Sequence, residues 1–155
     1  MSTILKELRP LFVIVLMITY ISFITSSNIE VFSLHFMAGF FLVFGSFKLM
    51  DLPGFVRGYQ KYDLLAHHLP IYGYLYAFFE LSLGTLYALG ITDYRLHLFT
   101  LCLMLFSGLG VLNAMRKHMD VRCACLGTLL NVPLSRVTLV EDFGMAAMAL
   151  WMLLS

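Results

Sequence analysis

Charged residues, cysteines and prolines are scarce in this sequence. Only 12% of the 155 residues are Asp, Glu, Lys or Arg, three are cysteine and four are proline. Three cysteines are too few for a disulfide framework. A net charge of +1 lacks the basic surplus that nucleic-acid binding requires, so we expect no nucleic-acid partner. No internal repeat or linker divides the chain, which predicts a single domain over residues 1–155.

Apolar residues, in contrast, make up 61% of the chain, and the mean hydropathy is +0.89. These values lie far outside those of soluble domains and predict an integral membrane protein in contact with the lipid bilayer. A helix needs about 20 mostly apolar residues to cross the bilayer. Candidate segments are residues 11–25, 36–50, 70–89, 96–115 and 139–154. We therefore predict an all-α, polytopic bundle of about five transmembrane helices, with the third and fourth forming an antiparallel hairpin.

Basic residues alternate between the connections. Two precede the first segment, three lie between Lys48 and Lys61, one lies between the third and fourth segments, and four lie between the fourth and fifth. The positive-inside rule then places the N-terminus and the loops around Tyr59 and Cys123 in the cytoplasm, and the C-terminus outside.

Two shorter patterns predict local structure. Phe55, Tyr59, Tyr62 and Ala66 recur at helical spacing, which favours a helix lying in the membrane interface. The run from Thr138 to Asp142 fits a capping box, with Thr138 as N-cap and with Glu141 and Asp142 as acids of the first turn.

The most informative motif is Cys123-Ala124-Cys125. Two of the three cysteines stand one residue apart beside Arg122, in a polar break between apolar runs. Residues at i and i+2 project to nearly opposite sides of a helix, so a shared site needs an extended or turn backbone. The neighbouring positive charge favours the thiolate, which is both the nucleophile and the metal-binding form.

A paired thiolate suits two chemistries. One is thiol–disulfide exchange, with the pair cycling between dithiol and disulfide. The other is binding of a soft ion such as Cu(I), Zn(II) or Hg(II), for which His118, Met115 and Met119 are additional candidate ligands. The alternative is that both cysteines only pack near the membrane surface. Cys102, within the fourth apolar segment, favours packing, and a resolving role is its alternative.

Ionisable residues inside apolar segments form the second candidate set. Lys48 and Asp51 stand three residues apart and can pair on one helix face or extend to the interface. Glu80 lies near the middle of the third segment, where an isolated carboxylate must be neutralised or paired. Lys48 is the natural partner of Glu80 if the two segments pack together. The pair is then either a functional site or a polar clamp that only holds the helices together. Gly84 and Gly90 would permit such close packing.

Several motifs in order resemble the membrane proteins of the MauE family, within the wider DoxX-like superfamily. The runs Gly45-Ser46-Phe47-Lys48-Leu49-Met50-Asp51-Leu52-Pro53-Gly54-Phe55 and Glu80-Leu81-Ser82-Leu83-Gly84 are similar to that family, as is the segment from Cys123 to Asp142. The resemblance implies a four-helix core plus one helix in the bacterial inner (plasma) membrane. It also implies redox maturation alongside a thioredoxin-like partner, with Cys123 and Cys125 as the active thiols.

The hypothesis is therefore an inner-membrane thiol-redox protein that exchanges disulfides or electrons with a thioredoxin-like protein. Soft-metal transport or transfer through the same thiolates, with a heavy-metal-binding partner, is one alternative. A structural membrane subunit is another. The sequence leaves open whether the chain forms a homo-oligomer.

Overall fold

The computed structural model describes residues 2–119 and 136–155, and all regular structure within those ranges is helical. The elements are α1 (Ser2–Thr25), α2 (Ile29–Met50), α3 (Leu52–Tyr59), α4 (Pro70–Ala88), α5 (Tyr94–Arg116) and α6 (Arg136–Leu154). The predicted all-α class is thereby confirmed.

Three of these helices are long and apolar enough to cross a membrane. They include residues Leu8–Thr25 of α1, Ile29–Met50 of α2 and Tyr94–Arg116 of α5. A helix satisfies all its backbone hydrogen bonds internally, which is why apolar helices can reside in lipid. The chain is thus a multi-pass membrane protein in a lipid bilayer. A count of five membrane-spanning helices, which adds α4 and α6, stays a prediction.

Three helices begin at least three residues earlier than predicted. α1 begins at Ser2 rather than at residue 11. α2 begins at Ile29 rather than at residue 36, because the Asn28 side chain accepts a hydrogen bond from the Val31 backbone N at 2.9 Å and caps the helix. α6 begins at Arg136, so Thr138 lies within the helix and is buried. The predicted capping box at Thr138 is therefore wrong.

The earlier start of α6 also moves its two acids away from the helix end. Its first turn contains no acidic residue, and Glu141 and Asp142 lie in the second turn. The expectation that the helix N-terminus stabilises them as first-turn acids is wrong. Instead, Asp142 is buried inside the bundle.

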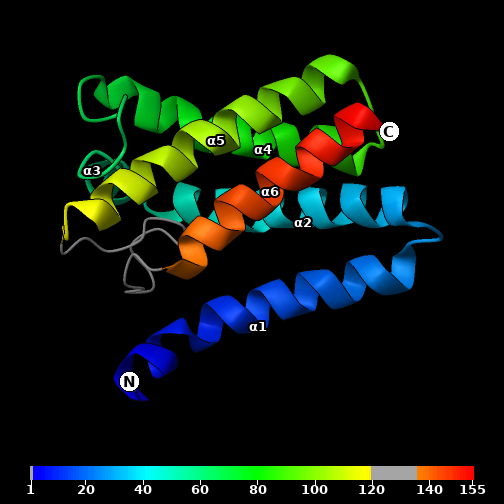
Figure 1. Cartoon of the computed structure of the whole chain (residues 1–155), viewed down its shortest axis with the longest axis horizontal. Coiled ribbons are helices and arrows are strands. Elements are labelled where there is room, and N and C mark those ends of the chain that lie inside the picture. The colour runs from blue at the N-terminus through cyan, green and yellow to red at the C-terminus, as the bar shows by residue number, and fades with distance from the viewer. Residues whose placement is uncertain (1, 120–135) are drawn as a thin grey trace.

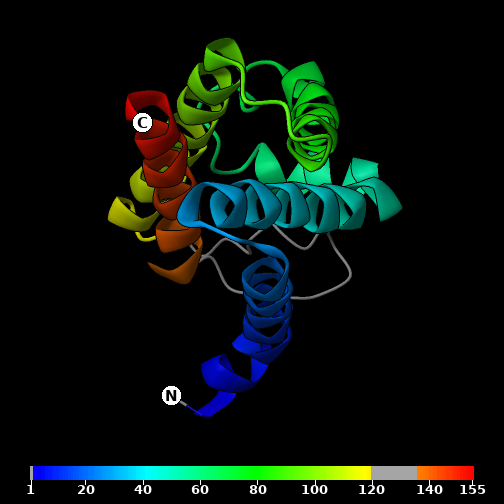
Figure 2. The same cartoon turned by 90° about the vertical axis from the view of Figure 1, so that its right-hand side faces the viewer.

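The long helices form two closely packed pairs, α2 with α4 and α5 with α6. Successive long helices run in opposite directions (Figure 1). The start of α1, the short α3, the end of α5 and the start of α6 lie at one end of the molecule, and the C-terminus lies at the other (Figure 1). This arrangement matches the predicted alternation of the connections between the two sides of the membrane. Which side faces the cytoplasm stays a prediction. α1 lies to one side and packs against α2 (Figure 2).

Glycines allow α2 and α4 to approach closely. A Cβ added at Gly84 would lie 2.8 Å from Leu42 Cγ and 2.9 Å from its backbone N, and one at Gly45 would lie 2.9 Å from Leu81 Cγ. Each helix therefore receives a leucine of the other, as Gly84 was predicted to permit. Gly90 does something else: it has a φ of +72° and open space around it, and it terminates α4.

The segment after α2 is a short helix and a turn rather than one interfacial helix. α3 ends at Tyr59, and Phe55, Tyr59, Tyr62 and Ala66 are all buried in the protein. The predicted interfacial helix is wrong for this reason: the aromatic face packs against α4, where Tyr59 lies 4.9 Å from Tyr76 between ring centroids. At its start, α3 is capped by the Asp51 side chain, which accepts from Gly54 N at 3.0 Å.

Candidate functional site: a buried polar cavity between two helix pairs

An ion pair joins α2 to α4 inside the protein. Lys48 Nζ donates to Glu80 Oε2, and the two residues are only 5% and 2% exposed. This confirms Lys48 as the partner of Glu80. The alternative in which Lys48 extends to the membrane interface is wrong, because its ammonium group lies in the bundle.

Aromatic rings complete the surroundings of the ammonium group. Lys48 Nζ is 5.4 Å from the ring centroid of Phe55 and 5.0 Å from that of Tyr76. Both distances are within the range at which an aromatic ring attracts a cation. Burial removes water from both ions, and a buried pair that loses one partner is destabilised by about 3–5 kcal/mol.

A second polar pair joins α5 to α6. Ser107 Oγ donates to Asp142 Oδ2 at 3.3 Å, and both residues are buried. α5 and α6 pack directly on each other here, since a Cβ added at Gly108 would be in van der Waals contact with Asp142 Cβ at 3.4 Å. This pair is not among the predicted site residues. Its only signal in the sequence is an acidic residue at the start of a long apolar run.

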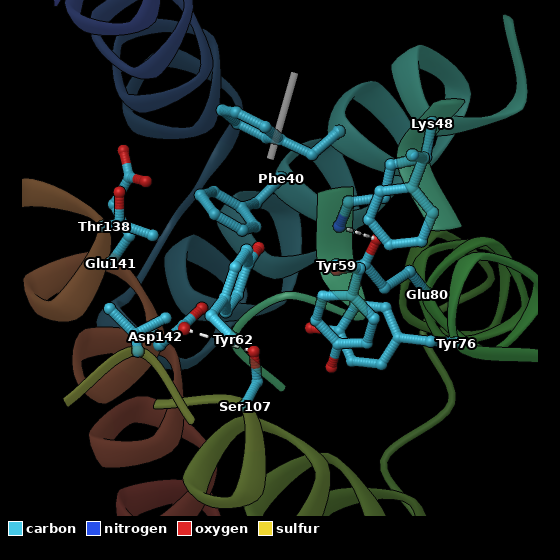
Figure 3. Close-up of a pocket in the computed structure, with 13 residues that line it drawn as sticks. Phe40, Lys48, Tyr59, Tyr62, Tyr76, Glu80, Ser107, Thr138, Glu141 and Asp142 are labelled. Atoms are coloured by element: carbon cyan, nitrogen blue, oxygen red, sulfur yellow. Dashed lines mark hydrogen bonds and ion pairs between the residues drawn. The ribbon is translucent and has the colours of Figure 1, made fainter. Parts of the chain in front are cut away.

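A small cavity of about 20 Å³ lies between these polar pairs. That volume is sufficient for about one water molecule. Figure 3 shows the two pairs on either side of a group of tyrosines. The cavity is lined by residues of α2, α4, α5 and α6, of the short α3 and of the turn after α3. They are Phe40, Phe44, Lys48, Phe55, Tyr59, Tyr62, Tyr76, Glu80, Ser107, Val111, Thr138, Glu141 and Asp142.

Tyr59 brings an unused hydroxyl group to this cavity. Its ring packs edge-on against Tyr62, with 5.5 Å between ring centroids, and the residue is 2% exposed. Within residues 2–119 and 136–155, the Tyr59 hydroxyl makes no hydrogen bond of good geometry, and it interacts with the phenol of Tyr72. Burial raises the pKa of the Tyr59 phenol well above its ordinary value near 10, so it stays a neutral donor at physiological pH.

Asp63 holds the turn after α3 beside the cavity. Its Oδ1 accepts from the backbone N of Leu65 at 2.9 Å and of Ala66 at 2.8 Å, whereas Oδ2 is buried without a partner in the described part of the chain. A Cβ added at Gly110 on α5 would lie 3.3 Å from Asp63 Cα. The turn therefore packs directly on α5, an arrangement that spacing along the sequence does not reveal.

The thiol candidates Arg122, Cys123 and Cys125 lie outside the described residues. The described chain stops at Met119, after α5, and resumes at Arg136 in α6. Both points lie at the end of the molecule that holds α3 (Figure 1). The second turn of α6 then carries Asp142 to the cavity. The cysteine-containing segment thus joins two helices that both line the cavity.

His118 has a backbone role in the structure. It has a φ of 50° and follows the end of α5, where His118 N donates to Met115 O and Met119 N donates to Ala114 O, both at 3.1 Å. This pair of bonds is a Schellman motif, which closes a helix with a left-handed residue. His118 is exposed.

Cys102 differs from its expected role. Its side chain is exposed on α5, so the prediction that it packs inside the bundle is wrong. Fourteen residues separate it from Arg116 at the end of α5, or about 20 Å along a helix. A resolving role for Cys102 depends on Cys123 and Cys125, which lie outside the described residues, and stays a prediction.

A metal site requires several ligands in one place. Among the residues that the structure describes, no group of three or more His, Cys, Asp or Glu side chains is placed to hold a metal ion. The soft-metal alternative therefore depends on Cys123 and Cys125.

Comparison with known proteins shows the family of this chain. The family described as methylamine utilisation protein MauE matches residues 1–155, and the chain belongs to this family. No curated protein matches, and no solved structure does.

Proposed function

We propose that this MauE-family membrane protein exchanges disulfides with a thioredoxin-like partner through Cys123 and Cys125. The observation that carries the proposal is the Cys-Ala-Cys sequence beside Arg122, because paired thiols next to a cation have the reactivity that exchange requires. The family match supports a membrane location for this chemistry. We place it in the bacterial inner membrane.

The exchange balances without a further reactant. One thiolate of the reduced pair attacks a sulfur of the partner's disulfide, forming a mixed disulfide and releasing a partner thiolate. The second cysteine then attacks the mixed disulfide, which closes the Cys123–Cys125 bond and releases the other partner thiolate. Two electrons and the two thiol protons pass to the partner. The reverse sequence reduces Cys123–Cys125.

Orientation sets the preferred direction of this exchange. The basic residues around the segment predict that it faces the cytoplasm. That compartment keeps thiols reduced. We therefore propose that the pair gives electrons to its partner.

Differential alkylation in intact cells tests the proposal. Free thiols are first blocked, the protein is treated with a reductant, and newly exposed thiols receive a mass tag. We expect a fraction of the chains to gain two tags that C123S and C125S each abolish. The matched control C102S, which removes the exposed cysteine of α5, should leave the two-tag species unchanged.

The same experiment separates the alternatives. Thiols that stay fully reduced through oxidant and reductant treatment would contradict redox exchange. Metal transfer would be favoured if the thiols stay reduced and if C123S/C125S cells also change in their resistance to Cu(I), Zn(II) or Hg(II), or accumulate less of these ions. Fully reduced thiols with no metal phenotype would favour a structural subunit.

A further inference from the structure

The cavity contains more carboxyl groups than cations. Glu80, Glu141 and Asp142 line it, and Lys48 is the cation that lines it in the described part of the chain. Lys48 Nζ already donates to Glu80. Asp142 accepts a hydrogen bond from the neutral hydroxyl of Ser107.

Among the described residues, the groups that face Asp142 from each packed element include one cation, Lys48, which is already paired with Glu80. α2 and α4 contribute the Lys48–Glu80 pair, α5 contributes the neutral Ser107, and α6 contributes Glu141. The turn after α3 adds the carboxyl of Asp63, which acts on Asp142 from beside the cavity, and the phenols of Tyr59, Tyr62 and Tyr76 line the cavity. Asp142 is 8% exposed. An ionised carboxylate in such a place is costly, and binding a proton removes the cost.

An independent feature also points to a small ligand. Glu141 lines the cavity, and its Oε2 is buried with no partner among residues 2–119 and 136–155. The buried Tyr59 hydroxyl also lines the cavity, and it interacts with the phenol of Tyr72 without a hydrogen bond of good geometry. The cavity volume of about 20 Å³ suits one water molecule, which needs two to four polar partners. A metal ion is less suited, because the described residues supply no group of three ligands.

We infer that the cavity is a proton-binding site in which Asp142 holds an exchangeable proton. A water molecule bound by the Tyr59 hydroxyl connects Asp142 to the Lys48–Glu80 pair. The site rests on the described residues alone and does not depend on the chemistry of Cys123 and Cys125. Its ligands are a proton and a water molecule.

Infrared spectroscopy of the full-length protein in lipid vesicles tests the site, since the C=O stretch of a protonated carboxyl is separate from that of a carboxylate. At neutral pH we expect a protonated-carboxyl band that shifts in D₂O and is lost in D142N. E30Q is the matched control, because Glu30 is exposed in the first turn of α2, and it should keep the band. K48M should gain a band, because Glu80 then lacks its cation.

A milder variant covers the case in which D142N does not fold. S107A removes the hydroxyl that donates to Asp142 and should move the band to higher frequency. A wild-type protein without a protonated-carboxyl band, or a band that neither D142N nor S107A alters, would overturn the proposal. So would a band that disappears when sodium replaces choline in the buffer, since the site would then bind a metal cation.

Discussion

Two buried polar clusters in the same bundle differ in how completely they are satisfied. Tyr87 of α4 meets His97 and Thr100 of α5, with Tyr87 Oη 3.1 Å from His97 Nδ1 and 2.9 Å from Thr100 Oγ1. Thr100 Oγ1 donates to the Leu96 carbonyl at 2.9 Å. Because a hydroxyl has one proton, this bond makes Thr100 the acceptor from Tyr87 and Tyr87 the acceptor from His97 Nδ1–H. Each hydroxyl then donates once and accepts once.

The cavity cluster is open by comparison. The Tyr59 hydroxyl, Asp63 Oδ2 and Glu141 Oε2 are buried and make no hydrogen bond of good geometry within the described ranges, although unpaired buried groups cost about 1–3 kcal/mol each. The closed cluster near Tyr87 thus ties α4 to α5 and uses the donors of both hydroxyls. The open cluster retains unused donors and acceptors, and such groups in a native protein mark a site for a ligand, water or chemistry.

The largest effect that separates the clusters should come from K48M. It leaves Glu80 buried without its cation, and we expect thermal unfolding in detergent to report a loss of about 3–5 kcal/mol. The matched control K61M changes an exposed lysine and should alter stability by less than about 0.5 kcal/mol. The double variant K48M/E80L should recover most of the loss. An equal stability for K48M and K61M would show that the ion pair does not stabilise the bundle.

G84A should have an intermediate effect on the helix pair that carries both Glu80 and Tyr87. The added Cβ would meet the Leu42 backbone N at 2.9 Å, which forces α2 and α4 apart at a cost of about 1–3 kcal/mol. G144A is the matched control, since a Cβ on that α6 glycine has open space. It should stabilise the helix by about 0.5–1 kcal/mol. Unfolding midpoints that move in the same direction for both variants would contradict the close packing of α2 and α4.

The smallest effect should come from Y87F in the closed cluster. Removing the hydroxyl breaks its contacts with His97 and Thr100, and we expect a loss of about 1–2 kcal/mol, with Thr100 still bonded to Leu96. The rate of thiol exchange should not change, because this cluster is structural. If the exchange rate falls in Y87F at equal amounts of folded protein, the cluster at Tyr87 affects the chemistry and is not only structural.

Sequence reasoning predicted the fold class and one part of the site. Apolar runs identify helices directly, and Lys48 and Glu80 stand out because ions are rare in such runs. It did not predict Ser107, Asp63 or the unused hydroxyl of Tyr59, because these roles arise from contacts between elements far apart in the chain. The pattern from Phe55 to Ala66 was misassigned since helical spacing does not distinguish a face toward lipid from one toward protein.

The site of chemistry itself is tested most directly by titrating the full-length protein in membranes against glutathione buffers, with mass-tagged alkylation as the readout. An intramolecular disulfide forms in a two-electron step. We therefore predict that Cys123 and Cys125 lose their free thiols together, at one buffer ratio, while Cys102 stays reduced. Two cysteines that titrate separately, or that stay reduced in the most oxidising buffer, would contradict the account.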